Sequence, residues 1–245
     1  MQLAELIFLV IAVLAGAYVR GYSGFGSALL WISSLSFILP PVQVIPTVFM
    51  LDVAASVHLL PKVWKQAHWR SLRWLLLGTL IATPPGLYLL ATLPATPVRV
   101  AIYTVVLATT GLLWRGFKLP RIPGPGPTLL TGLLSGLLNG TTGIAGPPAI
   151  LLYFSSPVTV AAARASVIAF LSGTHVLGIT LASGYGLITG NLLTRTLLLL
   201  PVVFAGIALG NRRFIHTEPE TFRRFVLLFL GVLSIAGLVR ALLYS

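Results

Sequence analysis

Two interruptions of hydrophobic sequence decide the expected fold: Arg20-GYSGFG-Ser27 near the start of the chain and Asn139-GTTGIAGPP-Ala149 past its middle. Their first glycines are separated by 140−21 = 119 residues and their second glycines by 143−24 = 119, nearly half of the 245-residue chain. Inside a membrane, backbone leaves the helix only where protein or a water-filled cavity satisfies its hydrogen bonds. Paired breaks in matching places therefore predict two related halves around a central binding site, the plan of a transporter.

The composition places the chain in a bilayer. Hydrophobic residues make up 57% of the sequence, charged residues 8%, and the mean hydropathy is +0.99. These values lie far from those of ordinary soluble domains. Stretches such as 3–19 and 74–93 have the length of a membrane-spanning helix. We therefore expect an integral membrane protein whose partner along most of its surface is lipid.

Several chemistries have no support in the sequence. The absence of cysteine excludes disulfides and thiolate metal sites. We expect no cofactor and no metal. No P-loop pattern is present, so we expect transport driven by a gradient rather than by ATP bound to this chain. The first apolar segment lacks a basic region before it and a small-residue cleavage site, and we expect it to be a retained helix rather than a signal peptide.

The net charge of +12 is concentrated in short stretches between apolar segments. Short loops rich in Lys and Arg stay cytoplasmic during insertion, so topology accounts for most of this excess and we expect no nucleic-acid partner. Three stretches carry most of the charge: Lys62, Lys65, Arg70 and Arg73; Arg115, Lys118 and Arg121; and Arg212, Arg213, Arg223 and Arg224.

Placing all three basic stretches on one side requires an even number of crossings between them. Counting each broken region as two crossings gives five crossings per half, and an odd number inverts the second half. Four per half would follow if the broken segments only re-enter, but this places the third stretch outside. We expect an all-α polytopic bundle of two inverted repeats with about eight to ten membrane segments. The repeats are 1–118 and 128–245, joined by a Pro/Gly linker, 119–127.

The two interruptions offer groups that bind anions. Their glycines permit turns, and the helices that start after them present unpaired N–H groups and a favourable dipole. Proline at the start of the second such helix ends the preceding one. The alternative is that the glycines serve close helix packing. The substrate-binding candidates are Gly21, Tyr22, Ser23, Gly24 and Gly26 in the first motif and Asn139, Gly140, Thr141, Thr142, Gly143, Gly146 and Pro147 in the second.

Three charges fall beside or within apolar segments: Arg20, Asp52 and Arg164. A charge inside a membrane is costly and marks a functional hypothesis. We assign Arg20 and Arg164 to substrate binding. Asp52 either pairs with an arginine or binds a coupling proton or sodium ion. His175, and less so His58, is either a proton relay or a hydrogen-bonded packing residue.

Two other functions stay open at this point. Gly21-Tyr22-Ser23-Gly24 reads as G-x-S-G, which resembles the serine loop of rhomboid intramembrane proteases, with His58 or His175 as base. The second copy has two threonines in place of a serine, and nothing in the spacing brings nucleophile and base together. A passive anion channel is the other alternative.

The motifs resemble those of the TauE/SafE sulfite exporter family, also called TSUP permeases. The strongest match is Ser135-GLLNGTTGIAGPPAILLYF-Ser155, which resembles the second-half signature of that family. Arg20-GYSGFGSALL resembles the first-half motif but has Gly26-Ser27-Ala28 where a triple glycine is commoner. The length, two-half plan and central linker also agree.

This resemblance implies a permease of the bacterial inner membrane for sulfur-containing anions such as sulfite and sulfonates. The residues themselves indicate only a small anion, because helix N-termini, hydroxyl groups and arginine accept oxyanions of many kinds. We therefore expect a secondary transporter rather than an enzyme, with a small sulfur anion and a proton or sodium ion as its ligands. A homo-oligomer is left open.

Overall fold

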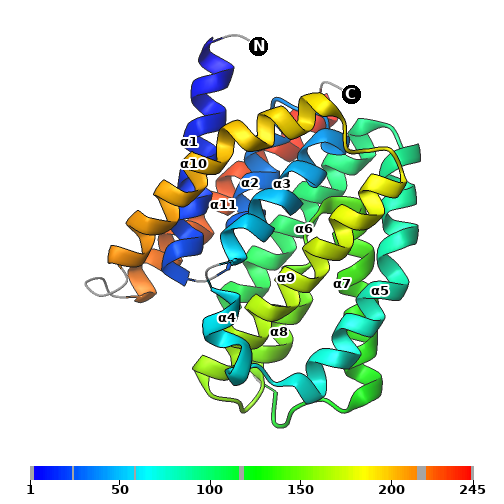
Figure 1. Cartoon of the computed structure of the whole chain (residues 1–245), viewed down its shortest axis with the longest axis vertical. Helices are drawn as coiled ribbons and strands as arrows, with labels where there is room; N and C mark the ends of the chain where they lie inside the picture. The colour runs from blue at the N-terminus through cyan, green and yellow to red at the C-terminus, as the bar shows by residue number, and fades with distance from the viewer. Residues whose placement is uncertain (1–2, 24, 58, 116–118, 214–218, 244–245) are drawn as a thin grey trace.

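The computed structural model describes residues 3–23, 25–57, 59–115, 119–213 and 219–243, and this part of the chain is helical without any strand (Figure 1). The all-α prediction is confirmed. The elements of the first half are α1 (Leu3–Ser23), α2 (Ser27–Leu35), α3 (Pro41–Ser56), α4 (Leu60–Val63), η1 (Trp64–Gln66), α5 (Trp69–Thr92) and α6 (Ala95–Arg115). Those of the second half are α7 (Pro125–Thr142), α8 (Gly146–Ser155), α9 (Val160–Gly184), α10 (Gly190–Arg213) and α11 (Pro219–Leu243).

The helix boundaries repeat with the offset seen in the glycine motifs. Helix α1 ends at Ser23 and α7 at Thr142 (142−23 = 119), and α3 begins at Pro41 and α9 at Val160 (160−41 = 119). The contacts repeat as well: α1 packs on α10 as α7 packs on α5, and α3 meets α9, its own counterpart. This is the pattern that two related halves would produce. The inversion of one half relative to the other stays a prediction.

Each broken segment folds back on itself. The indole Nε1 of Trp31 in α2 donates to the Val13 carbonyl of α1 at 2.9 Å, so α2 lies alongside α1. In the second half, the carbonyl of Ser155 at the end of α8 accepts from the amide of Leu119, in the segment that leads into α7. Helices of nine and ten residues, α2 and α8, reach only about half of a bilayer core. The hairpin tips lie inside the protein, and the number of crossings stays a prediction.

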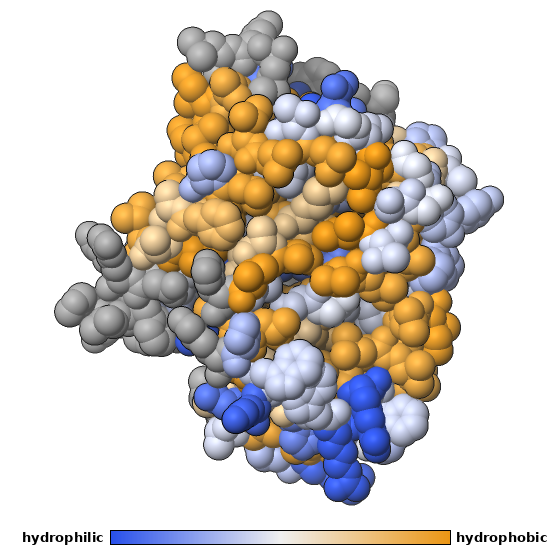
Figure 2. All heavy atoms as spheres, viewed as in Figure 1, coloured by the Kyte–Doolittle hydropathy of each residue, from blue (hydrophilic) through white to orange (hydrophobic). Residues whose placement is uncertain are grey.

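The surface has the character expected of a membrane protein. Among the described residues, five helices are long and apolar enough to cross a bilayer: Glu5–Tyr22, Trp69–Thr92, Ala95–Leu112, Ala161–Gly184 and Gly190–Gly210. Apolar residues cover most of the visible face, and hydrophilic residues gather at its lower end, beside α4 and the start of α5 (Figure 2). Exposed leucines such as Leu130, Leu197 and Leu198 are then lipid-facing residues.

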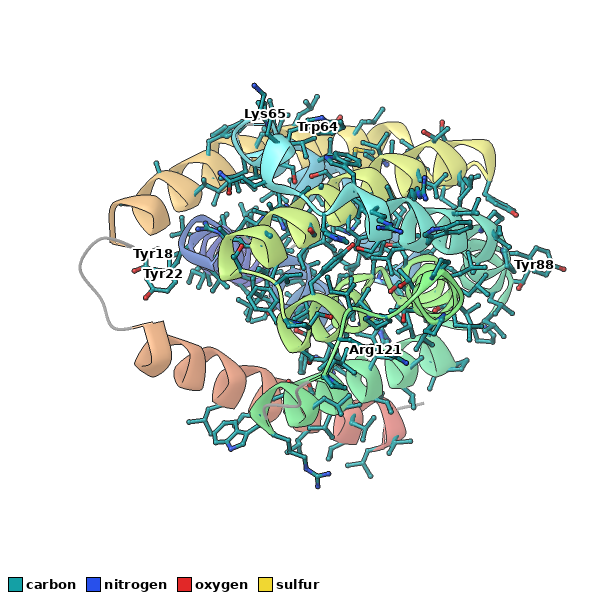
Figure 3. All side chains as sticks on the ribbon, turned by 90° about the horizontal axis from the view of Figure 1, so that it is seen from below. Tyr18, Tyr22, Trp64, Lys65, Tyr88 and Arg121 are labelled. Atoms are coloured by element: carbon teal, nitrogen blue, oxygen red, sulfur yellow. The ribbon has the colours of Figure 1, made fainter. Side chains whose placement is uncertain are left out.

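The first basic stretch lies at this lower end, where exposed Lys65 and Arg70 accompany Trp64 and Trp69. The two indole rings are 4.3 Å apart between centroids, and Figure 3 shows Trp64 and Lys65 at the edge of the molecule. The linker segment that precedes α7 also lies at the lower end (Figure 1). Aromatic and basic residues in this arrangement are typical of a membrane interface.

The Pro/Gly linker is shorter than the sequence indicates. Helix α7 begins at Pro125, so the last three residues of 119–127 form its first turn. Proline is accepted there because the first helical amides have no intrahelical partner to lose. The division of the chain into repeats around this linker stays a prediction.

Glycine spacing provides a test of the helix pairing. A β-carbon on Gly140 would lie 2.5 Å from the Thr83 carbonyl oxygen and the Leu87 amide nitrogen of α5, whereas one on Gly111 of α6 would meet nothing within 4 Å. We expect Gly140→Ala to cost about 1–3 kcal/mol of folding free energy through overpacking. Gly111→Ala, the matched control, should leave the melting temperature of the detergent-purified protein unchanged or higher, since alanine favours helix. Equal melting temperatures for the two variants would contradict the α5–α7 packing.

Candidate functional site: a buried polar cluster between two helix breaks

The backbone breaks lie in the later part of the first motif and near the middle of the second. Residues 20–23 belong to α1, and Gly26, with φ of 93°, precedes α2; Gly24 lies outside the described residues. In the second motif residues 139–142 belong to α7, and Gly143, with φ of 72°, ends it. Both torsions are in the left-handed region that glycine adopts without strain. Gly146 and buried Pro147 begin α8.

The first glycine of each motif serves helix packing. A β-carbon on Gly21 would collide with the Ile207 backbone of α10, as one on Gly140 would collide with the backbone of α5. Because both glycines lie inside helices, their amides take part in helical hydrogen bonding. The alternative weighed from the sequence, close helix packing, describes these two positions.

The two threonines of the second motif are bonded within their own helix. The Thr141 hydroxyl donates to the Leu137 carbonyl at 2.8 Å, and the Thr142 hydroxyl to the Leu138 carbonyl at 2.7 Å. Such bonds four residues back are common for Thr in helices. Each hydroxyl oxygen still has acceptor capacity, but its donor is used, so neither threonine offers a free donor to an anion in this conformation.

The predicted charged residues Arg20 and Asp52 meet at the first break. Both are fully buried, and Nη1 of Arg20 lies 3.4 Å from Oδ2 of Asp52. Nη2 of Arg20 donates to the Ser56 hydroxyl at 2.6 Å, and this hydroxyl donates to the Asp52 carbonyl at 2.7 Å. The Ser27 hydroxyl at the start of α2 donates to Oδ1 of Asp52 at 2.6 Å. Three helices therefore meet on one carboxylate.

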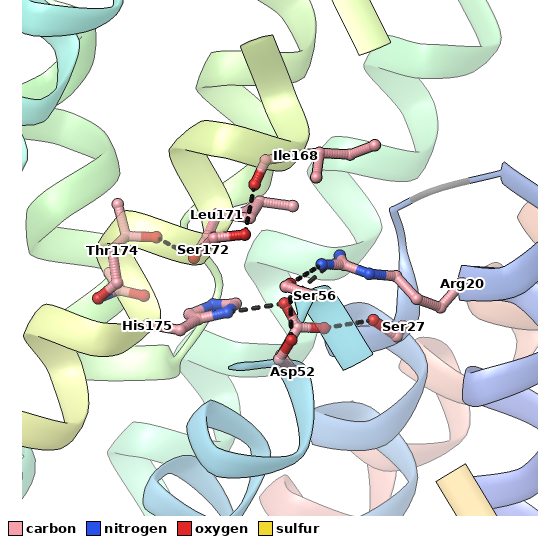
Figure 4. Close-up of polar contacts among 10 residues, drawn as sticks. Arg20, Ser27, Asp52, Ser56, Ile168, Leu171, Ser172, Thr174 and His175 are labelled. Carbon is pink, nitrogen blue, oxygen red and sulfur yellow. Dashed lines mark hydrogen bonds and ion pairs between the residues drawn. The ribbon is translucent and has the colours of Figure 1, made fainter. Parts of the chain in front are cut away.

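His175 of α9 brings the second half of the chain to the same carboxylate. Its Nδ1 lies 2.7 Å from Oδ2 of Asp52, and its ring stacks on Phe49 with centroids 5.3 Å apart. Figure 4 shows Arg20 and His175 approaching Asp52 from opposite sides. Nε2 of His175 and Nε of Arg20 have no hydrogen-bond partner among the described residues, although both side chains are fully buried. The polar cluster thus retains unused hydrogen-bonding capacity.

Asn139 and Arg164 lie close to this cluster. Nδ2 of Asn139, near the end of α7, donates weakly to the Thr174 carbonyl at 3.4 Å, while its buried Oδ1 has no partner in the described part of the chain. Arg164 in α9 is half-buried, and its charge acts on that of Arg20. Arg20, Asn139 and Arg164 therefore bring polar groups from α1, α7 and α9 toward one region of the interior.

Residues at equivalent positions of the two halves build the cluster. The 119-residue offset relates Arg20 to Asn139 and Ser56 to His175. It also relates Ser27 to Gly146 and Asp52 to Leu171, and a β-carbon on Gly146 would lie 3.8 Å from Cδ2 of Leu171. The contact of Arg20 with Ser56 thus has a counterpart in that of Asn139 with Thr174, the residue before His175. The contact of Ser27 with Asp52 has one in the packing of Gly146 beside Leu171. The cluster lies where the halves meet, and its chemistry is asymmetric.

Ser27 and Ser56 were not predicted. Ser56 lies four residues after Asp52, on the same helical face, and this spacing is the signal that indicates it. Ser27 follows the last glycine of its motif, where a helix N-terminus attracts a carboxylate. Of the other candidates, His58 lies outside the described residues, and the side chain of Ser23 is not described.

Comparison with known proteins gives the class of the chain. The family model described as "Sulfite exporter TauE/SafE" matches residues 8–237. The chain belongs to this family of multi-pass membrane transporters. Because its members are transporters rather than enzymes, the serine-protease alternative is not favoured, nor is the passive channel.

Two curated relatives agree with this assignment. The "Probable sulfite/organosulfonate exporter TauE" of Cupriavidus necator is 24% identical over 219 residues, covering 86% of this chain and 84% of the relative. The "Probable inner membrane transporter protein TsaS" of Comamonas testosteroni is 31% identical over 183 residues, covering 72% and 75%. No solved structure matches the chain significantly.

The buried pair makes a testable contribution to stability. Asp52→Asn leaves Arg20 buried without its counter-charge, and breaking such a pair costs about 3–5 kcal/mol. We expect Asp52→Asn and Arg20→Gln each to lower the melting temperature. The double variant should lose less folding free energy than the sum of the losses of the two single variants. The coupling free energy should be about 0.5–3 kcal/mol. Additive losses would show that the two side chains do not interact in the folded protein.

Proposed function

We propose that this protein is a secondary transporter of the bacterial inner membrane for small sulfur-containing anions, such as sulfite, sulfonates and related organosulfur compounds. One observation carries the proposal: Arg20 is fully buried beside a helix break, and its Nε and Nη1 have no hydrogen-bond partner among the described residues. An oxyanion that binds there would satisfy these buried donors. The family description and the name of the Cupriavidus necator relative support a sulfur oxyanion as that anion.

The substrate lies between the two hairpin tips in this proposal. At the first tip, the guanidinium group of Arg20 and the N-terminus of α2 supply donors. At the second, Asn139 and the start of α8 face the same turn of α9, at Thr174 and Leu171. Pro147 and Pro148 remove two amide donors from α8, so the first tip is the stronger anion site. Movement of one half against the other would alternate access.

Asp52 and His175 are the proposed ion-coupling residues. Their side chains meet at 2.7 Å, and they connect α3 with α9, the helices that lie at the contact between the halves. A carboxylate and an imidazole in this arrangement can exchange a proton. A change of charge at this point would act on both halves at once.

The substrate class is tested by thermal stabilisation of the detergent-purified protein with sulfite, sulfate, thiosulfate, taurine, sulfoacetate and acetate. A ligand that binds only the folded state raises its apparent stability. We expect a selective upward shift with a sulfur anion, lost in Arg20→Gln and weakened in Arg164→Gln. Arg195→Gln is the matched control, because Arg195 bonds to Gln43, more than two helical turns from Asp52 on α3. Equal shifts with every anion, or none, would count against the proposal.

Coupling is tested in proteoliposomes. We expect Asp52→Asn to abolish sulfite accumulation driven by a proton or sodium gradient and to spare exchange of labelled for unlabelled sulfite, since only the coupling group is lost. Glu5→Gln, which alters the carboxylate at the start of the first candidate span, is the control. Gradient-driven uptake at the wild-type rate in Asp52→Asn would remove Asp52 from the coupling mechanism.

A further inference from the structure

The first helix break ends in an anion site that the protein fills itself. No side chain caps the N-terminus of α2. Instead Ser27, its first residue, donates to Oδ1 of Asp52 at 2.6 Å, and Nη1 of Arg20 lies 3.4 Å from Oδ2. A helix N-terminus, a hydroxyl and a guanidinium are the groups that accept small oxyanions. The carboxylate of Asp52 therefore lies against two of these groups, the Ser27 hydroxyl and the Arg20 guanidinium, at the uncapped N-terminus of α2.

The corresponding junction in the second half of the chain has no carboxylate. The equivalent of Asp52 in the second half is Leu171, which packs beside Gly146, the equivalent of Ser27. A leucine therefore supports the same junction between a broken helix and the following long helix. A buried carboxylate is expensive in a membrane protein and is usually retained for function. The position of Asp52 points to a role in binding or coupling rather than in folding alone.

Arg20 has donors to spare for a second anion. Nη2 is held by Ser56, and Nη1 faces Asp52 without hydrogen-bond geometry. Nε has no partner among the described residues. A guanidinium group forms strong bonds to oxyanions when two of its N–H groups point to the same ligand. Arg20 is therefore only partly satisfied by the carboxylate beside it.

We propose that the carboxylate of Asp52 competes with the substrate anion for Arg20 and Ser27, beside the uncapped N-terminus of α2, and yields these two ligands when it takes up a proton. This inference rests on the proposed function and deepens it. The proton bonds to a carboxylate oxygen of Asp52 and so removes one negative charge from the cluster. A monovalent substrate anion that binds to Arg20 brings one negative charge back. The charge of the cluster is thus unchanged, and each anion binds with one proton. Release of the anion returns the carboxylate to Arg20 and the proton to the aqueous phase.

The surroundings of Asp52 fit this exchange. The charged and titratable groups that act on it are Arg20 from α1 and His175 from α9, while α2 contributes the Ser27 hydroxyl. Arg164 of α9 acts on Arg20, and Arg195 of α10 bonds to Gln43 near the start of α3. Nδ1 of His175 lies 2.7 Å from Oδ2, the oxygen that Nη1 of Arg20 also faces, and His175 approaches from the opposite side, where it offers a route for the proton.

The test measures the Kd of methanesulfonate, which stays a monoanion between pH 5.5 and 8, and of sulfite, by calorimetry on the full-length protein. In Asp52→Asn the competitor is removed, so we expect methanesulfonate to bind at least about tenfold more tightly at neutral pH, a change equivalent to about 1.4 kcal/mol. Wild-type affinity for methanesulfonate should rise as the pH falls, and that of Asp52→Asn should not. Arg20→Gln should lose binding, and Arg195→Gln should match the wild type.

The outcomes separate this inference from the proposed function. Weaker or equal methanesulfonate binding by Asp52→Asn, with wild-type binding intact, overturns the competition. If Asp52→Asn does not fold, the wild-type protein decides, because an affinity for methanesulfonate that is independent of pH also overturns it. Failure of wild type and Asp52→Asn alike to bind methanesulfonate or sulfite counts against the proposed function instead.

Discussion

A buried carboxylate in an apolar interior is the constraint on which the arrangement of the helices depends. An isolated charge at this depth costs at least about 2.5 kcal/mol even on insertion scales, and more where water is excluded. Asp52 is accommodated because Arg20, Ser27 and His175 come to it from three other helices. The Asp52 side chain therefore connects α3 with α1, α2 and α9. The first break lies where the carboxylate needs hydrogen-bond donors.

Small residues hold these helices close enough for that convergence. Gly21 packs against the backbone of α10 and Gly140 against that of α5, so each hairpin is anchored to a long helix immediately before its break. Such contacts replace the hydrophobic driving force that is missing between helices in lipid. Gly143 adds a second constraint, because its positive φ and the nearby Ile32 side chain leave no room for a β-carbon. The hairpin tips are thereby fixed in position, and their polar groups are held in register.

Much of this plan was predictable from the sequence, and the exceptions have physical reasons. The repeated motifs and apolar segments predicted the helical membrane fold and pointed to Arg20, Asp52 and His175. Within each predicted interruption the helix continues for about three residues past the first glycine, because contacts of Gly21 and Gly140 with neighbouring helices outweigh the low helix propensity of glycine. The pairing of Asp52 with His175 joins residues 175−52 = 123 positions apart, and no local pattern encodes such a contact.

Two identical halves would not build this cluster, because its residues differ between the two halves of the chain. Two identical halves would bring two arginines and two aspartates to the interface, a set that is neutral and already paired. Here Arg20 corresponds to Asn139, Asp52 to Leu171 and Ser56 to His175, so one ion pair and one imidazole remain. A single ion pair can open and re-form without separating further charges, and the imidazole offers a place for the proton. In the proposed mechanism, differences between the two halves at these few positions would therefore be sufficient to make a site for one anion.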